Sequence, residues 1–170
     1  IVRRDKMTEP LLEVEDLKVY FPVGDEWQKR DRRMVKAVDG VSLSLQRGEV
    51  LALAGESGCG KTTLGRSIVG LTKPTKGTIK FKGKAINKLS TEERKVFRQK
   101  MQMVFQDPFD SMNPRKTAFE MIAQPLSINK IVPKIELLSE VLRLFEIVGL
   151  SPSKSYLRRS RYQLSGGERQ

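Results

Sequence analysis

The residue pattern at positions 55–62 constrains this chain more than any other feature of its sequence. It runs Gly-Glu-Ser-Gly-Cys-Gly-Lys-Thr and matches the spacing G-x-x-x-x-G-K-[ST]. Glycines there let the backbone curl until successive N–H groups point at an anion, and a helix that begins near Lys61 adds the positive end of its dipole. The pattern predicts a phosphate-binding loop made of Gly55, Glu56, Ser57, Gly58, Cys59, Gly60, Lys61, Thr62 and Thr63.

The residues on either side of this loop support the prediction. Residues 50–54 are apolar throughout and bounded by glycine, which predicts a strand buried on both faces. After the loop, apolar residues recur at helical spacing as far as Gly70, where a helix is expected to end. In such a loop Lys61 is expected to reach the β- and γ-phosphates of ATP, and the hydroxyl of Thr62 is expected to bind Mg²⁺.

Alternating apolar and polar residues predict further strands in the N-terminal part. The alternation covers residues 11–21, which we interpret as a strand pair, and continues at 41–45 and 78–81. Residues 101–105 are expected to form one more strand, which leads into Gln106. The charged segment 24–36 is too polar for a core and is expected to be an exposed loop.

Helical signals occur around residue 90 and dominate residues 117–150. Ser90–Glu93 and Thr117–Glu120 each have the sequence of a capping box, which opens a helix. Residues 107–116 contain two X-Pro pairs and are expected to be a loop. A longer helix is expected from Pro133 to Gly149, with one apolar face formed by Ile135, Leu138, Leu142, Phe145 and Val148.

Composition narrows the class of protein. Apolar residues make up 38% and charged residues 31% of the 170 residues, which is typical of a folded globular chain. Cys59 is the sole cysteine, so no disulfide can form within the chain. The net charge of +12 fits nucleic acid, an anionic membrane surface or a solvated basic face, although no arginine-rich helix or aromatic-basic alternation points to nucleic acid.

A second glycine-rich motif occurs at Leu164–Glu168. Ser165 is a good N-cap and Glu168 completes a capping box, so the motif can be a plain polar helix start. A helix N-terminus with two glycines and a hydroxyl is also an anion site. Both interpretations remain open from the motif alone.

Taken together, these motifs resemble those of the ATP-binding subunits of ABC transporters. Residues 55–62 are similar to their Walker A motif, 164–168 to their signature motif, and Gln106 to their Q-loop glutamine. Within that superfamily the segments 35–42, 55–61 and 106–115 are most similar to the oligopeptide/dipeptide importer group. The resemblance covers residues 11–170.

The resemblance implies an α/β fold: a partial P-loop NTPase core with an N-terminal antiparallel β edge and an α-helical subdomain. Residues 1–170 would be one truncated ABC ATPase domain, with the nucleotide-binding α/β core at 11–106 and the Q-loop and helical subdomain at 107–170. The family's Walker B aspartate, catalytic glutamate and switch histidine would follow Gln170. We therefore expect these 170 residues alone to bind ATP weakly and not to hydrolyse it at a transporter's rate.

The resemblance also implies roles for individual residues. Lys61 and Gln106 would be catalytic, and Thr62 and Gln106 would bind Mg²⁺. An aromatic residue near the end of the first strands would stack on adenine; Phe21 is our choice and Tyr20 the alternative, since strand alternation puts them on opposite faces. Phe21 as an ordinary core residue is the competing interpretation. The ATP held by the opposite subunit would contact Ser165, Gly166, Gly167 and Glu168.

The partners follow from the same resemblance. A second ATPase subunit would face the chain head to tail, and residues 107–125 would dock transmembrane permease subunits at the cytoplasmic face of the membrane. An extracytoplasmic solute-binding protein would act indirectly, and no nucleic acid is expected. The implied function is an ATPase that powers import of peptides or similar small solutes. The alternatives are a soluble ABC ATPase that acts on nucleic acid or ribosomes, and an inactive nucleotide-binding fragment.

Overall fold

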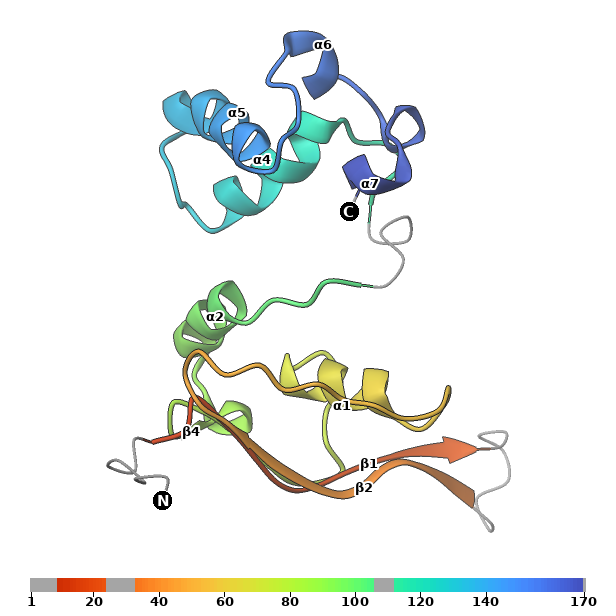
Figure 1. Ribbon diagram of the computed structural model, residues 1–170. Helices are drawn as coiled ribbons and strands as arrows, with labels where there is room; N and C mark the ends of the chain where they lie inside the picture. The colour runs from red at the N-terminus through yellow and green to blue at the C-terminus, as the bar shows by residue number, and fades with distance from the viewer. Residues whose placement is uncertain (1–8, 24–32, 106–111, 170) are drawn as a thin grey trace, which may run out of the picture. The chain divides into compact units, whose positions relative to one another are not determined.

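The computed structural model describes residues 9–23, 33–105 and 112–169 (Figure 1). The chain divides into two compact units, residues 1–103 and residues 104–170, and each is described on its own. None of the helices in these ranges is long and apolar enough to cross a membrane.

The first unit contains an antiparallel four-stranded sheet in the order β2-β1-β3-β4. Its strands are β1 (Leu12–Val23), β2 (Arg33–Leu45), β3 (Lys76–Phe81) and β4 (Lys84–Ala85). The expected antiparallel β edge is therefore confirmed, but residues 12–21 belong to one strand, β1, rather than to a strand pair. The expectation of a loop throughout 24–36 is wrong at 33–36, because these residues pair with the end of β1.

The core of the first unit lies between the sheet and helix α1 (Lys61–Ile68), which packs on one face of β1 and β2 (Figure 1). Leu17 and Val19 are fully buried, as their alternation predicts. Strict alternation fails just before them, where Asp16 has φ of 41° and the pairing register shifts. The buried core residues are Leu12, Val14, Leu17, Val19, Val38, Leu64 and Ile79.

Helix ends in this unit follow their local sequence. After α1, Gly70 has φ of 75° and its N–H donates to the Ser67 carbonyl, so the helix ends where glycine predicts. A short 3₁₀ turn, η1 (Ile86–Lys88), precedes α2 (Thr91–Lys100). At the start of α2 both hydrogen bonds of the Ser90–Glu93 capping box are formed.

The two strands expected at 50–54 and 101–105 are not formed. Val50 is 93% exposed and Val104 is 79% exposed, and both segments have irregular backbone. A strand buried on both faces needs hydrogen-bonded neighbours, and no strand in the described ranges pairs with either segment. Apolar composition alone is therefore insufficient to form these strands.

The second unit is helical. Its elements are α4 (Ala118–Ile128), η2 (Lys134–Glu136), α5 (Leu137–Ile147), α6 (Lys154–Leu157), η3 (Arg161–Gln163) and α7 (Gly166–Arg169). The Thr117–Glu120 capping box that opens α4 is confirmed by both of its bonds. The core contains Ala118, Ala123, Leu126, Val141, Phe145, Tyr156, Leu157 and Leu164.

The helix expected from Pro133 to Gly149 starts later and buries part of the expected face. A 3₁₀ turn follows Pro133, and α5 proper begins at Leu137. Val141 and Phe145 are buried, whereas Ile135 is 91% exposed and Val148 is 67% exposed. The 3₁₀ turn changes the angular position of Ile135 relative to α5. Of the five expected residues, Phe145 belongs to the core and Leu142 packs against it.

Candidate nucleotide-binding site

The loop at 55–62 leads directly into α1. Gly60 is the N-cap of that helix, with φ of 95° and ψ of 1°, and Gly58 has φ of 82°. L-residues rarely adopt such angles, so glycine is required at both places. Lys61 is the first residue of α1, which gives the loop-to-helix transition that the sequence predicts.

The side chain of Lys61 folds back over the loop. Its Nζ donates to the carbonyl oxygens of Gly55 at 2.8 Å and Glu56 at 2.6 Å, and it lies 3.4 Å from the Sγ of Cys59. The ammonium group is thereby held inside the curled backbone.

The loop is fixed to the sheet through Gly60. Val19 pairs with Val38 and Tyr20 pairs with Lys36, so Ala37 is an extra residue in β2 and forms a β-bulge. A Cβ atom on Gly60 would overlap the carbonyl oxygen of Ala37. Only a glycine therefore permits this approach between the loop and the bulge.

The two candidate aromatic residues have different environments. The Tyr20 hydroxyl donates to Asp39, which raises the pKa of Tyr20 and lowers the pKa of Asp39. Phe21 is 43% exposed and pairs with Val35, two residues along β2 from Ala37, which is about 7 Å at the usual strand rise. Phe21 is thus not a core residue, and it lies on the part of the sheet that carries the loop.

The remaining loop residues include two threonines, Thr62 and Thr63. Thr62 is exposed, while the carbonyl oxygen of Thr63 accepts a bond from Ser67 within α1 at 2.9 Å. Hydroxyl, ammonium and close-packed glycines fit phosphate and Mg²⁺. Gln106, the other expected Mg²⁺ ligand, lies outside the described residues. No cluster of three acidic, cysteine or histidine side chains occurs within the described ranges.

In the second unit, the Leu164–Glu168 motif forms the capping box that its sequence predicts. The Ser165 N–H donates to the Glu168 carboxylate at 2.6 Å, and the Glu168 N–H donates to the Ser165 hydroxyl at 3.4 Å. Gly166 and Gly167 are exposed, and a Cβ on either would meet no atom within 4 Å. The motif leaves its two glycines accessible to a ligand.

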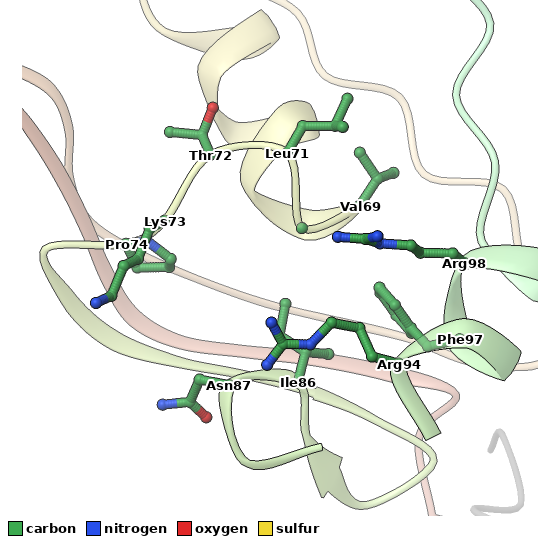
Figure 2. A pocket seen from close by; sticks show the side chains of 11 residues that line it. Val69, Leu71, Thr72, Lys73, Pro74, Ile86, Asn87, Arg94, Phe97 and Arg98 are labelled. Carbon is green, nitrogen blue, oxygen red and sulfur yellow. The ribbon is translucent and has the colours of Figure 1, made fainter. Parts of the chain in front are cut away.

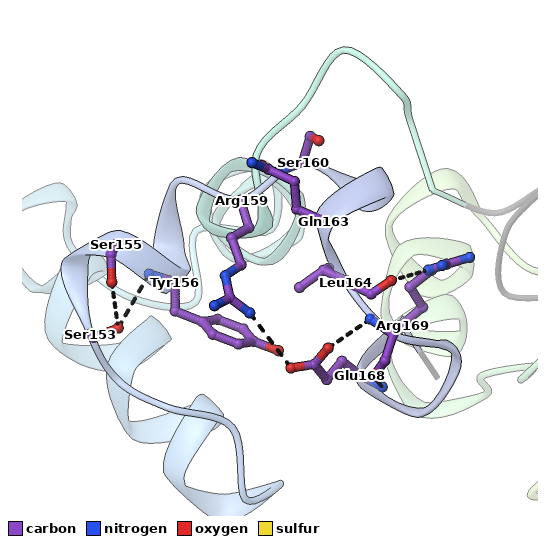
Figure 3. A network of polar contacts seen from close by, with 10 residues as sticks. Ser153, Ser155, Tyr156, Arg159, Ser160, Gln163, Leu164, Glu168 and Arg169 are labelled. Carbon is purple, nitrogen blue, oxygen red and sulfur yellow. Dashed lines mark hydrogen bonds and ion pairs between the residues drawn. The ribbon is translucent and has the colours of Figure 1, made fainter.

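The Glu168 carboxylate is held by more residues than the sequence indicates (Figure 3). Arg159 lies 3.8 Å from it and also covers the ring of Tyr156, whose buried hydroxyl lies beside the same carboxylate. Hydrogen bonds from the Ser165 backbone and side chain lower the pKa of Glu168 to about 2, with smaller contributions from the neighbouring Tyr156 hydroxyl and the positive charge of Arg159. Tyr156 and Arg159 were missed because neither belongs to a recognisable motif.

Comparisons with known proteins identify the family. The family model described as ABC transporter matches residues 38–170. The oligopeptide transport ATP-binding protein AppF of Bacillus subtilis is 48% identical over 95% of this chain and 49% of its own length. The dipeptide transport ATP-binding protein DppF of Escherichia coli is 40% identical over 96% of this chain and 48% of its own length. The chain therefore spans about half the length of the curated relatives it matches.

Solved structures show the same fold. One is an ATP-binding cassette solved as a dimer in a post-hydrolysis state with ADP and Pi bound. It has a TM-score of 0.73 and 24% sequence identity, and the match covers 93% of this chain and 65% of that one. The structure of cbiO1 from Clostridium perfringens, part of the ABC transporter complex cbiONQ, has a TM-score of 0.66 and 25% identity, over 95% of this chain and 58% of that one. The fold is thus a partial ATP-binding cassette, and the chain belongs to the ABC transporter family.

Proposed function

We propose that this chain is the nucleotide-binding part of an ATPase subunit that powers import of oligopeptides or dipeptides. The observation that carries the proposal is the Lys61 ammonium group, which is held inside a glycine loop at the start of α1. The names of the relatives, AppF and DppF, supply the class of solute.

In the proposed binding step, Lys61 exchanges loop carbonyls for phosphate oxygens. Its two carbonyl partners, on Gly55 and Glu56, are neutral acceptors, whereas the phosphates of ATP are charged acceptors and make stronger bonds. The N-terminus of α1 adds its positive dipole end at the same place. Thr62 and Gln106 would hold Mg²⁺, which neutralises phosphate charge when bound.

Adenine would stack on Phe21. The side chain of Phe21 is exposed, whereas the Tyr20 hydroxyl is already hydrogen-bonded to Asp39. The bulge at Ala37 fixes the loop to the same stretch of β2 that pairs with Phe21. The adenine base on Phe21 and the phosphates in the loop would therefore both lie beside the same sheet.

A second ATPase subunit would complete the site. Ser165, Gly166 and Gly167 are exposed at the start of α7 and would face the phosphates bound by the partner's loop in a head-to-tail dimer. The segment 107–125 would dock permease subunits at the cytoplasmic face of the membrane, and a solute-binding protein would act indirectly. Within that segment Phe109 lies outside the described residues, whereas Met112 and Phe119 pack against the helical core. The exposed residues among those described are Asn113, Pro114, Arg115, Glu120, Gln124 and Pro125.

A growth test addresses this proposal. A strain that lacks the gene for the full-length protein, and needs one amino acid supplied only within a peptide, is complemented with wild type, Lys61→Ala or Lys88→Ala. Loss of a charge-assisted phosphate contact removes about 1.5–3 kcal/mol of binding. We therefore expect Lys61→Ala to bind ATP about ten- to a hundredfold more weakly and to abolish growth on the peptide.

The controls separate transport from general damage. Lys88 is an exposed lysine of η1, away from the loop sequence, so Lys88→Ala should grow on the peptide as wild type does. All strains should grow on the free amino acid. Normal growth of the Lys61→Ala strain on the peptide, with the variant as the sole copy, would refute the proposed function.

A further inference from the structure

A pocket in the first unit is lined by residues that do not belong to the nucleotide site described above. Its volume is about 390 Å³, and it lies between the segment 69–74, which follows α1, and one side of α2 (Figure 2). Residues Ile86 and Asn87 of η1 close it below. All of its lining residues belong to the first unit.

The charged residues that line this pocket are all cationic. They are Lys73 on the segment after α1, and Arg94 and Arg98 on α2. No carboxylate is among the lining residues. Arg94 and Arg98 are four residues apart on one helix, where like charges repel and destabilise the helix by about 0.2–0.5 kcal/mol.

In the part of the chain that the structure describes, none of these three cations is neutralised by a carboxylate, a property that they share with several exposed cations of the same unit, such as Lys88 and Lys95. Lys18, Lys36, Lys80 and Lys84 each form an ion pair with a carboxylate. Within the described ranges, Lys73, Arg94 and Arg98 have no ion pair or side-chain hydrogen bond. Glu93, which precedes Arg94 in sequence, is engaged by Lys84 and by the capping box of α2.

Neutral donors and an apolar wall complete the pocket. Asn87 and Thr72 add an amide and a hydroxyl, and the side chains of Ile86 and the buried Phe97 supply apolar surface. The backbone N–H groups of Gly70, Leu71 and Thr72 already donate to carbonyls of α1. A ligand would therefore be held by side chains rather than by backbone groups.

We propose that this pocket binds a phosphomonoester, with Arg94 and Arg98 as the main contacts and Lys73 as an additional cation. Guanidinium groups match phosphate oxygens in pairs, and a phosphomonoester carries close to two negative charges at neutral pH. A monoanionic group would leave most of the positive charge uncompensated. The volume exceeds that of a phosphate group alone, so the apolar wall can contact the organic part of the ligand.

The proposal does not depend on the function proposed for the 55–62 loop. Its phosphate source is either a soluble phosphorylated metabolite or the headgroup of a phosphomonoester lipid, because both present the same group. A competing role exists for Arg98, which points toward Val69 at the C-terminal end of α1, where the helix dipole favours a cation (Figure 2). That role predicts a change in stability and no change in phosphate binding.

The test uses the full-length protein with its nucleotide loop saturated by MgADP. Binding of glycerol 3-phosphate is measured by calorimetric titration. Binding to lipid is measured by flotation with two kinds of phosphatidylcholine vesicle. One kind contains phosphatidic acid, and the other contains phosphatidylglycerol, a phosphodiester, in the amount that gives the same negative charge. The variants are Arg94→Gln, Arg98→Gln and Arg94→Lys. The matched control is Lys95→Gln, which removes one positive charge from the same helix without lining the pocket.

We expect phosphomonoester binding that Arg94→Gln and Arg98→Gln each weaken at least about tenfold. Arg94→Lys should weaken it less, because it keeps the charge and loses the paired contact, and Lys95→Gln should leave it within about twofold. Binding of glycerol 3-phosphate indicates the soluble source, and binding of phosphatidic acid alone indicates the lipid. If Arg98→Gln lowers the melting temperature, Arg94→Gln still carries the test, since Arg94 lies one turn earlier.

Three outcomes would overturn the proposal. The first is an absence of any binding that depends on Arg94 or Arg98. The second is an equal loss in Lys95→Gln, and the third is equal flotation with phosphatidylglycerol. Either of the last two outcomes would show that binding depends on the general positive charge of this surface and not on the pocket.

Discussion

The contact between Gly60 and the β-bulge at Ala37 makes a prediction that two glycine substitutions can isolate. Gly58 and Gly60 both have positive φ, at 82° and 95°, so Gly→Ala at either place carries backbone strain of about 1–2 kcal/mol. The surroundings differ. A Cβ on Gly58 meets no atom within 4 Å, whereas a Cβ on Gly60 overlaps the Ala37 carbonyl oxygen.

The difference between the two variants therefore measures the contact with the bulge. Forcing a methyl group into a packed contact costs typically about 1–3 kcal/mol beyond the backbone strain. We expect Gly58→Ala to lower the free energy of unfolding by about 1–2 kcal/mol and Gly60→Ala by about 2–5 kcal/mol. The atom that must move is a backbone carbonyl in a strand, so the clash cannot be relieved by a side-chain rotation.

Urea denaturation of the full-length protein without nucleotide measures both values. Omitting nucleotide removes any contribution from altered ATP binding, which each substitution would also change. An m-value close to that of wild type in both variants would show that the native states are comparable. Equal losses of stability for Gly58→Ala and Gly60→Ala would refute the claim that the loop is fixed to the sheet through Gly60.

Two further predictions concern Cys59 and Glu168. Cys59 is exposed within the loop and is the sole cysteine of this chain, so we expect maleimide to label it and MgATP to slow the labelling; equal rates with and without MgATP would place the thiol away from bound nucleotide. Glu168 has a folded pKa of about 2 against an ordinary value of 4.5, so its stabilising contribution is complete above pH 4.5 and is lost as pH falls toward 2. The difference in free energy of unfolding between wild type and Glu168→Gln, measured by urea denaturation, should be constant from pH 7 to about 5 and shrink below pH 4.5. A difference that stays constant down to pH 3 would contradict the lowered pKa of Glu168.

Local features of the fold were predictable from the sequence because their causes are local. The capping boxes at Ser90–Glu93, Thr117–Glu120 and Ser165–Glu168 each form as predicted, since a hydroxyl and a carboxylate three residues apart satisfy the first N–H groups of a helix. Glycine also marked the end of α1 and the turn after α5. These signals require no contact with a distant part of the chain.

Features that depend on distant partners were not predictable in the same way. Residues 50–54 have the composition of a buried strand, but a strand needs a paired neighbour, and pairing is absent within the described ranges. In the candidate site, the position of Lys61 at the start of α1 follows from the motif, whereas the bulge at Ala37 depends on the register between β1 and β2. The Tyr156–Arg159–Glu168 network likewise depends on how α6 and α7 meet, and no sequence period encodes that.

The bulge also has a consequence for how the length of this chain can vary in evolution. One residue added to or removed from the connection between β1 and β2 leaves the paired register of both strands unchanged. Deleting Ala37 would instead remove the register shift between Val19 and Tyr20, together with the carbonyl that Gly60 approaches. Insertions and deletions are thus expected to accumulate between Val23 and Arg33, while the spacing between the bulge and the glycine loop stays constant.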